Sequence, residues 1–406
     1  MKYITRTVWI LSFISLFTDV ASEMLYPIMP VFLQSIGFSV VLIGILEGIA
    51  EATAGICKGY FGKLSDNSGK RAPFIQWGYV LSALTKPMMV LFVFPVWIFF
   101  VRTLDRFGKG IRTGARDAML SDEATPETKG KVFGLHRGMD TFGAVLGPVF
   151  ALVFLYFRPA DYKALFLIAF LPGVAAVLTT LFLKDKKKTH RPVTKTSTPF
   201  FSFLNYWKES PLLYRKVVMG LLVFALFNSS DMLLLLRVKQ SGLDDTHVIG
   251  LYIFYNLIYA LSSLPFGMIA DKVSLKKVFT FGLILFAAVY LGMALSTNIY
   301  VYVALFFLYG LYAAATEGIS KAWISNITDK KDTATAIGSF AGFQSIAAMI
   351  ASSLAGAIWF WFGVETAFVL TSAITILVII YFVFVIPTPK TGKSLVSQKI
   401  PNHNHF

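Results

Sequence analysis

The chain has 406 residues, of which 56% are hydrophobic and only 15% are charged. Soluble proteins carry about 25% charged residues, so the composition excludes an ordinary water-soluble protein and predicts an integral membrane protein surrounded by lipid. The net charge of +15 does not indicate a nucleic-acid-binding protein, because the Lys and Arg residues lie in short segments between apolar runs.

The apolar runs are long enough to span a bilayer, which takes about 20 residues. In the first half of the chain they cover 8–33, 40–61, 73–92, 96–118, 132–157 and 163–183. In the second half they cover 216–236, 247–269, 276–295, 300–325, 334–361 and 365–386. The first run follows Lys2 and Arg6 as in a signal peptide, but its length and its Asp19 and Glu23 indicate a spanning helix. We therefore expect an all-α membrane protein with twelve transmembrane helices.

The Lys and Arg residues of the loops are distributed unequally between the two sides. If the N-terminus is cytoplasmic, the outer loops hold only Arg158, Lys163 and Lys239, with Arg237 at a border. Positive residues concentrate on the cytoplasmic side of membrane proteins. We expect a multi-pass protein of the cell inner (cytoplasmic) membrane with both termini in the cytoplasm.

The segment 184–215 is the one long polar interruption, and its Lys, Thr and Pro content is typical of a cytoplasmic linker. It separates an N-terminal six-helix bundle over 1–183 from a C-terminal six-helix bundle over 216–386, and a cytoplasmic tail over 387–406 follows. Gly62-Lys-Leu-Ser-Asp66, after the second run, is echoed by Gly267-Met-Ile-Ala-Asp271, after the eighth. An internal repeat of this kind predicts two pseudo-symmetric bundles with a binding site between them.

The loop after the second run also contains a longer motif, Gly-x-Leu-x-Asp-x-x-Gly-Lys-Arg. Its residues are Gly62, Leu64, Asp66, Gly69, Lys70 and Arg71. With this motif the chain resembles the major facilitator superfamily over essentially its whole length. Two further features of that family are matched by Arg106 and Gly110 and by Gly143, Gly147 and Pro148. The stretches 105–112 and 133–140 are similar to a bacterial and archaeal subgroup whose substrates are mostly unassigned.

The resemblance implies secondary transport by alternating access, with a gate at the cytoplasmic side. Gly62, Asp66, Lys70 and Arg71, with Asp271 as the second-half counterpart of Asp66, are the implied gating residues. Such a gate needs charge pairs and helix-end contacts that break and re-form between states. The alternative is that the basic residues only keep the loop inside. Gly143, Gly147 and Pro148 allow close helix packing and a local bend.

Charged residues on the fourth run fall at steps of three and four: Arg102, Asp105, Lys109, Arg112 and Arg116. This spacing places them on one face of a helix, with Arg106 off that face. A charge deep in a bilayer costs about 2.5–3.5 kcal/mol, so the face must contact other helices or a wet cavity. Acidic residues on neighbouring runs indicate a paired network inside the bundle.

The charged residues within the runs are the candidates for a substrate or coupling site. They are Asp19, Glu23, Glu47, Glu51, Asp105, Arg106, Lys109, Arg112, His136, Asp140, Asp231 and Glu317. Asp231 ends a polar interruption of the seventh run, and Glu317 is spaced to pair with Lys321. A group that changes its protonation would couple transport to protons, and Glu23, Glu51 and His136 are the candidates. The alternative for each is a purely structural role.

No Gly-x-x-x-x-Gly-Lys-Ser/Thr motif for ATP is present, which favours a secondary transporter. Charges of both signs favour a polar, anionic or zwitterionic small molecule over a hydrophobic drug. In the family, many antiporters have a Gly-Gly pair after the Gly-Pro motif, and Ala151 and Leu152 replace it here. This replacement weakens the argument for export and leaves both directions open, and proton-coupled export is the direction that we expect. Import of an anionic metabolite or of a metal chelate such as a siderophore is the alternative.

Other classes of protein receive less support. Neither a nucleophile elbow nor a His-Glu-x-x-His motif is present, so we expect no enzyme, cofactor or metal site. A non-transporting membrane sensor or receptor is a further alternative, although the short loops provide no soluble domain. The expected partners are a small-molecule substrate, membrane lipid and a proton, without nucleic acid, and the protein is expected to be a monomer.

Overall fold

The computed structural model describes residues 4–26, 28–29, 32–33, 36–159, 161–185, 199–243 and 245–387. Residues 186–198 of the linker predicted over 184–215 and nearly all of the tail predicted over 387–406 lie outside the described residues. The first half contains α1 (Arg6–Glu23), α3 (Val40–Ser68), α4 (Ala72–Leu91), α5 (Pro95–Asp122), α6 (Lys129–Phe157) and α7 (Tyr162–Thr180). The second half contains α9 (Leu212–Ala225), α10 (Met232–Gln240), α11 (Asp245–Lys272), α12 (Leu275–Leu295), α13 (Ile299–Asn326), α14 (Thr333–Phe362) and α15 (Val364–Val385).

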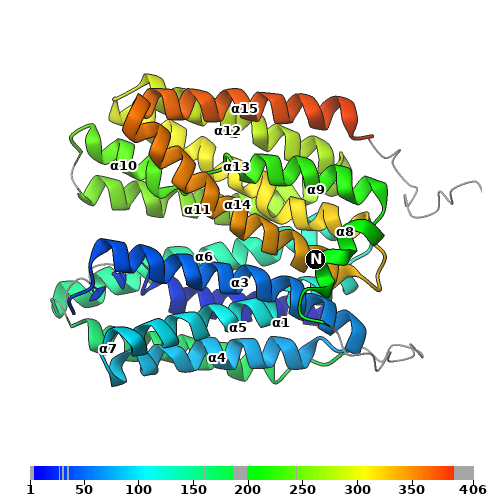
Figure 1. Ribbon diagram of the computed structural model, residues 1–406, viewed down its shortest axis with the longest axis horizontal. Helices are drawn as coiled ribbons and strands as arrows, with labels where there is room; N and C mark the ends of the chain where they lie inside the picture. Colours follow the sequence, from blue (N-terminus) through cyan, green and yellow to red (C-terminus); the bar gives the residue numbers. More distant parts are fainter. Residues whose placement is uncertain are drawn as a thin grey trace, which may run out of the picture.

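The two halves lie side by side with their long helices running in roughly the same direction (Figure 1). The predicted all-α fold of two six-span bundles is confirmed. The start of α1, the end of α15 and the short helices η1 (Ser202–Asn205) and α8 (Tyr206–Glu209) lie at one end of the molecule, here called the linker end. The opposite end is called the far end.

The seventh span is broken, which differs from the single run predicted over 216–236. Helix α9 ends at Ala225 and α10 begins only at Met232. The intervening polar side chains compete with the backbone for hydrogen bonds, which disfavours helix: the Oγ of Ser230 accepts from the N–H of Met232 at 3.3 Å. The N–H of Ser230 itself donates to the Oγ of Ser352 in α14 at 3.1 Å. The first span, predicted over 8–33, likewise leaves the helix after Glu23. Broken helices of this kind occur in transporters where they line a cavity.

Seven of the described helices are long and apolar enough to cross a membrane by length and composition alone: α6, α7, α11, α12, α13, α14 and α15. The remaining long helices, α1, α3, α4 and α5, all belong to the first half. They carry charged residues in their middle turns, among them Asp19, Glu51, Lys86 and Asp105. The charge of the protein's interior is therefore concentrated in the first half.

Two helix pairs form the seam between the halves: α3 against α14, and α6 against α11. Both seams depend on glycine. A Cβ on Gly134 of α6 would lie 2.5 Å from the carbonyl oxygen of Ser263 in α11. A Cβ on Gly342 of α14 would lie 2.6 Å from the carbonyl oxygen of Gly55 in α3. Backbones approach this closely only where small residues face each other.

Gly143 and Gly147 bring α6 equally close to α1 within the first half. A Cβ on Gly143 would lie 2.5 Å from the carbonyl oxygen of Leu16 and 2.9 Å from the Cβ of Asp19. A Cβ on Gly147 would lie 2.7 Å from the amide nitrogen of Met24. Pro148 is buried in the same stretch of α6. The packing therefore fixes the position of the first charged residue of α1.

The segment 199–211, here called the strap, lies across the linker end. The ring of Phe203 packs directly against Gly59 of α3, where even a methyl group would collide with it. The Nζ of Lys63 donates to the carbonyl oxygen of Ser202 at 2.8 Å. The ring of Tyr206 contacts that of Tyr214 on α9, with centroids 5.2 Å apart. Burial raises the pKa of the Tyr206 phenol, which therefore stays uncharged. The strap thus joins the first half to the second.

Phe203→Ala is expected to release the strap, because removing a buried Phe side chain costs about 3–5 kcal/mol of packing. Chymotrypsin should then cut at Tyr206, which is only 5% exposed in the intact structure. The matched control is Phe201→Ala, which removes a ring that is 59% exposed and should leave Tyr206 protected from cleavage. Equal resistance of both variants would show that Phe203 does not hold the strap.

Candidate functional site

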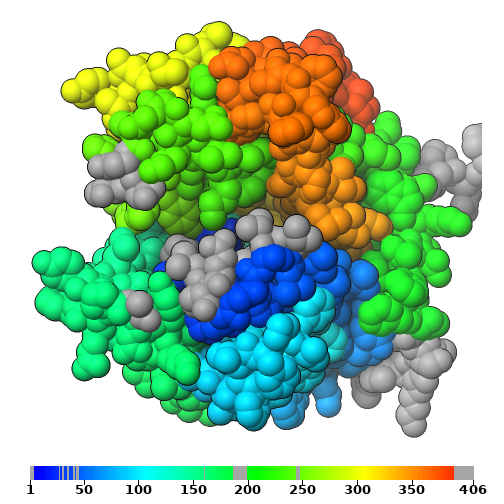
Figure 2. All heavy atoms as spheres, turned by 60° about the vertical axis from the view of Figure 1, so that its left-hand side comes forward, coloured from blue at the N-terminus to red at the C-terminus, as the bar shows by residue number. Residues whose placement is uncertain are grey.

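A cavity of about 950 Å³ lies between the two halves. Its walls come from α1, α3, α5 and α6 in the first half, and from α11, α13, α14 and the break between α9 and α10 in the second. Figure 2, in which the far end comes forward, shows a recess between the halves. Sites for small molecules have volumes of about 300–1,000 Å³, so this cavity has the size of a substrate site.

The linker end is held closed by two carboxylates that each cap a helix of the other half. Asp66 of α3 accepts from the N–H of Thr335 in α14 at 2.6 Å and from its Oγ1 at 2.7 Å. Asp271 of α11 accepts from the N–H groups of Gly130 and Lys131 in α6, both at 2.7 Å. The first turn of a helix leaves such N–H groups without partners inside the helix. The residues preceding α6 and α14 provide no side-chain cap of their own.

The residues of the loop motif, predicted from the resemblance to form a gate, meet around Asp66. Arg71 donates its NH2 group to the Asp66 carboxylate at 2.6 Å, and both side chains are almost fully buried. Gly62 lies so close to Ala334 of α14 that a Cβ would overlap the carbonyl oxygen. Lys70 differs, because its side chain is exposed and makes no ion pair with any residue that the structure describes. The motif thus places its glycine, its acid and its arginine at the seam.

Two arginines of α5 are neutralised by acids of α3. Arg102 holds the Glu47 carboxylate with its Nε at 2.7 Å and its NH2 at 3.0 Å. Arg106 pairs with Glu51 at 3.1 Å. Both arginines line the cavity, as do the two acids.

Four of the five charged residues predicted to share a face of α5 line the cavity: Arg102, Lys109, Arg112 and Arg116. The structure differs from the prediction at two positions. Arg106, expected off the charged face, lines the cavity, whereas Asp105 points toward α4. There its carboxylate accepts from Lys86 at 3.0 Å and from the Oγ1 of Thr85 at 3.2 Å. The orientation of the Asp105 side chain is decided by a partner on a different helix. The spacing of residues along the sequence carries no information about such a partner.

Three cations that line the cavity have no ion-pair partner among the residues that the structure describes: Lys58, Lys109 and Arg112. The Nζ of Lys58 donates to the Oγ of Ser345 at 2.7 Å. The NH1 of Arg112 donates to the Oγ of Ser82 at 2.5 Å, and its guanidinium stacks over Tyr79. The ammonium of Lys109 makes no hydrogen bond within the described structure. These cations leave positive charge available to a ligand.

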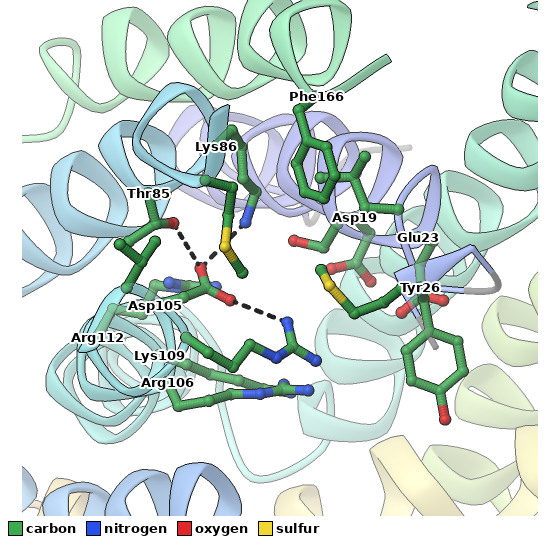
Figure 3. Close-up of a pocket in the computed structure, with 16 residues that line it drawn as sticks. Asp19, Glu23, Tyr26, Thr85, Lys86, Asp105, Arg106, Lys109, Arg112 and Phe166 are labelled. Carbon is green, nitrogen blue, oxygen red and sulfur yellow. Dashed lines mark hydrogen bonds and ion pairs between the residues drawn. The ribbon is translucent and has the colours of Figure 1, made fainter. Parts of the chain in front are cut away.

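Two carboxylates face these cations without a basic partner among the described residues. Asp19 and Glu23 of α1 lie across a small side pocket from Arg106 and Lys109 (Figure 3). Glu23 also accepts from the hydroxyl of Tyr252 in the second half at 3.5 Å. The side pocket has a volume of about 80 Å³ and lies within the first half. Acid and base thus face each other without pairing.

The remaining predicted residues are divided between the cavity and the protein interior. Asp140 lines the cavity and accepts from Arg137 and from the Oγ of Ser15, both at 2.5 Å. Asp231 accepts from the hydroxyl of Tyr255, and Glu317 lines the second-half wall. His136 is 4% exposed and does not line either described cavity.

Two further groups of residues were not singled out as site residues from the sequence. The first group is charged and comprises Lys58, Lys86 and Asp117. The second is an aromatic wall in the second half: Tyr252, Tyr255, Tyr259, Tyr309 and Tyr312. The three- and four-residue spacing of the tyrosines on α11 is a helical stripe that was available in the sequence. The cavity therefore has a charged wall and an aromatic, hydroxyl-bearing wall.

The i,i+4 spacing predicted an ion pair between Glu317 and Lys321. The described structure does not contain this ion pair. Lys321 instead reaches Asp117 of α5 at 2.8 Å. Asp117 is 1% exposed and also binds Arg116 at 3.0 Å. A fully buried carboxylate from the other half offers stronger attraction than an i,i+4 neighbour beside a wet cavity.

Comparisons with known proteins agree with this architecture. The model of the Major Facilitator Superfamily matches residues 11–255 and 240–405. An uncharacterized MFS-type transporter of Methanocaldococcus jannaschii is 33% identical over 364 residues, which are 88% of this chain and 89% of that protein. The staphyloferrin B transporter of Staphylococcus aureus is 28% identical over 333 residues, 77% of this chain and 76% of that protein.

The same fold is found among solved structures. The human organic anion transporter MFSD10 (TETRAN) superposes with a TM-score of 0.78 at 14% identity, covering 93% of this chain and 99% of that one. Two six-span halves, a central cavity and a match along almost the whole sequence agree. The chain is a multi-pass membrane protein and a secondary transporter, not an enzyme, and it belongs to the Major Facilitator Superfamily.

Proposed function

We propose that this transporter moves a small organic anion together with a proton through the central cavity. The observation that carries the proposal is the set of unpaired cations Lys58, Lys109 and Arg112 on the cavity wall. An anion provides the charge that these groups lack, and its desolvation is offset by charge-assisted hydrogen bonds. The names of two similar proteins, a staphyloferrin B transporter and an organic anion transporter, agree with an anionic substrate.

Proton coupling follows from the carboxylates of α1. Asp19 and Glu23 face Lys109 across the side pocket, so their negative charge repels an anion bound there. A proton on either carboxylate removes this repulsion, and the proton and the anion therefore favour each other's binding. By linkage the coupling is reciprocal. Anion affinity should rise as the pH falls toward the range in which these carboxylates take up protons.

Alternating access then requires the bundles 1–183 and 216–386 to rock about the cavity. With the linker end in the cytoplasm of the cell, as the positive loop residues favour, the structure is an outward-facing state of an inner-membrane protein. Asp66 and Arg71, with Gly62 packed beside them, and Asp271 in the second half, are the gate that closes the cytoplasmic side. Lys70 contributes positive charge to the same loop.

The direction of transport follows from the sign of the coupling. Cooperative binding of a proton and an anion is symport, which drives uptake under an inward proton gradient. The export expected from the sequence would instead require an antiporter, in which proton and substrate compete. Import of an anionic metabolite or a metal chelate is thus the better-supported direction.

The test uses proteoliposomes that contain a pH-sensitive dye, with succinate and citrate added outside as probes. Symport predicts that the anion acidifies the lumen, whereas antiport predicts that it makes the lumen alkaline. Glu23→Gln should reduce the proton flux by roughly the 5–150-fold typical of a coupling free energy, while anion exchange continues. Glu365→Gln is the matched control. It makes the same chemical change on a side chain that is 59% exposed and pairs with Arg237. A flux without any proton movement would contradict the coupling.

A further inference from the structure

The unpaired cations of the cavity occupy two places rather than one. Lys109 and Arg112 line both the central cavity and the side pocket. Lys58 lies on α3, lines only the central cavity and bonds to Ser345 of the other half. Lys58 and Lys109 line the same central cavity, so the two places are neighbours. The inference drawn from them rests on the proposed function.

The other cations of the cavity are already neutralised. Arg102 and Arg106 bind the acids of α3, Arg137 binds Asp140, and Lys321 binds Asp117. Glu51, which lines the same cavity as both lysines, is bonded to Arg106 at 3.1 Å. Buried charges in proteins are normally paired or hydrogen-bonded. Lys109 is an exception, because its ammonium has neither kind of partner in the described structure. Lys58 has only the neutral hydroxyl of Ser345. Both ammonium groups can therefore bind an anionic group.

The side pocket sets the size of the group that enters it. A single water needs about 10–15 Å³, so the 80 Å³ of the pocket accommodates a few waters or one carboxylate, but not a whole organic molecule. The body of a ligand held there must remain in the central cavity. That position brings it past Lys58 and toward the tyrosines of the second half.

We propose that the substrate carries at least two anionic groups. One enters the side pocket and binds Lys109 and Arg112, and the second binds Lys58 on α3. A dicarboxylate or tricarboxylate satisfies both places, whereas a monocarboxylate leaves one ammonium unpaired. The second group also reaches the seam, because Lys58 contacts Ser345 of α14. A ligand that fills both places therefore acts on contacts of both halves of the protein.

The experiment compares succinate with propionate, which share a short chain and differ by one carboxylate. Anion-dependent proton flux into proteoliposomes gives an apparent KM for each probe. The wild type should prefer succinate by at least about tenfold, the equivalent of 1.4 kcal/mol. Lys58→Gln should bring the ratio of the two KM values close to one. Lys109→Gln should weaken both probes, since both use the side pocket.

Lys58→Arg retains the charge, serves as the folding control and should restore the preference for succinate. Equal KM values for the two probes in the wild type would overturn the inference while leaving anion transport intact. A succinate preference that persists in Lys58→Gln would overturn it as well. The absence of flux with any carboxylate, citrate included, would overturn the proposed function itself.

Discussion

Asp66→Asn is expected to open the linker end of the protein by increasing the population of the state in which α3 and α14 separate. The carboxylate makes four contacts that a neutral amide cannot reproduce together: the N–H of Ala334, the N–H and Oγ1 of Thr335, and Arg71. Hydrogen bonds to charged groups contribute about 1.5–3 kcal/mol each. Only the bonds to α14 cross the seam, so their loss selectively destabilises the closed linker end.

A shift of about 2.8 kcal/mol changes the ratio of the two states by about 100-fold. Ser339 is 4% exposed in α14, one turn beyond Thr335, and it becomes accessible only if the linker end opens. The rate at which a maleimide labels Ser339→Cys, in a Cys57→Ser background, reports that minor population. In Asp66→Asn we expect this rate to rise by about 10- to 100-fold.

Asp271→Asn is the matched comparison in the second half. Asp271 also caps a helix across the seam with two N–H contacts, but it is half-buried and no arginine is bonded to it in the described structure. In Asp271→Asn, the rate of labelling at Ser339→Cys should rise less than it does in Asp66→Asn. If labelling of Ser339→Cys is unchanged in a folded Asp66→Asn protein, the cross-seam cap does not act as a gate.

The spans and the two halves were predictable because the bilayer imposes them. A hydrocarbon layer fixes the length of an apolar run, and duplication makes the second half repeat the first. The gating motif was equally accessible, since Gly62, Asp66 and Arg71 are close in sequence and meet around one turn. Local chemistry and an external length scale thus give the architecture.

The orientation of the charged helix α5 could not be predicted, because it depends on contacts between helices. Spacing alone placed Asp105 with Lys109 and excluded Arg106 from the same face. In the structure, Lys86 of α4 draws Asp105 away, and the acids of α3 draw Arg106 in. The directions of these two side chains are decided by the pairing energies of several partners at once. The break in the seventh span was visible as polar residues, but its effect on the helix was not.

Long-range pairing was the other feature that the sequence did not show. Asp117 sits beside Arg116 in a stretch rich in charge, and nothing local indicates that its second partner is Lys321, on the tenth span. The i,i+4 spacing favoured Glu317 as the partner of Lys321 instead. Only the three-dimensional seam reveals a buried carboxylate shared between the two halves.

Asp117→Asn is expected to destabilise the protein strongly. The carboxylate is 1% exposed and lies 3.0 Å from Arg116 and 2.8 Å from Lys321. Removing one member of a buried ion pair costs about 3–5 kcal/mol, because the remaining charge is left uncompensated. Two cations are left here, and they repel each other. The apparent Tm of the detergent-purified protein should fall by roughly 5–10 °C.

Lys321→Met separates the loss of the pair from the loss of charge balance. It removes the cross-seam contact but leaves Asp117 neutralised by Arg116 on its own helix. The decrease in Tm should therefore be smaller than in Asp117→Asn. The double variant Asp117→Asn/Lys321→Met removes the repulsion and should be more stable than Asp117→Asn alone. Contacting residues show coupling energies of about 0.5–3 kcal/mol in such a cycle.

The same pair also distinguishes the two conformations. Arg116 and Asp117 belong to α5, whereas Lys321 belongs to α13, so only the second contact must break when the halves rock apart. Lys321→Met should thus raise the labelling of Ser339→Cys although it costs little stability. If Tm and labelling change in proportion across the three variants, the pair supports the fold alone. A rise in labelling without a matching decrease in Tm would instead identify Asp117 and Lys321 as a second lock, one helical layer closer to the cavity than Asp66.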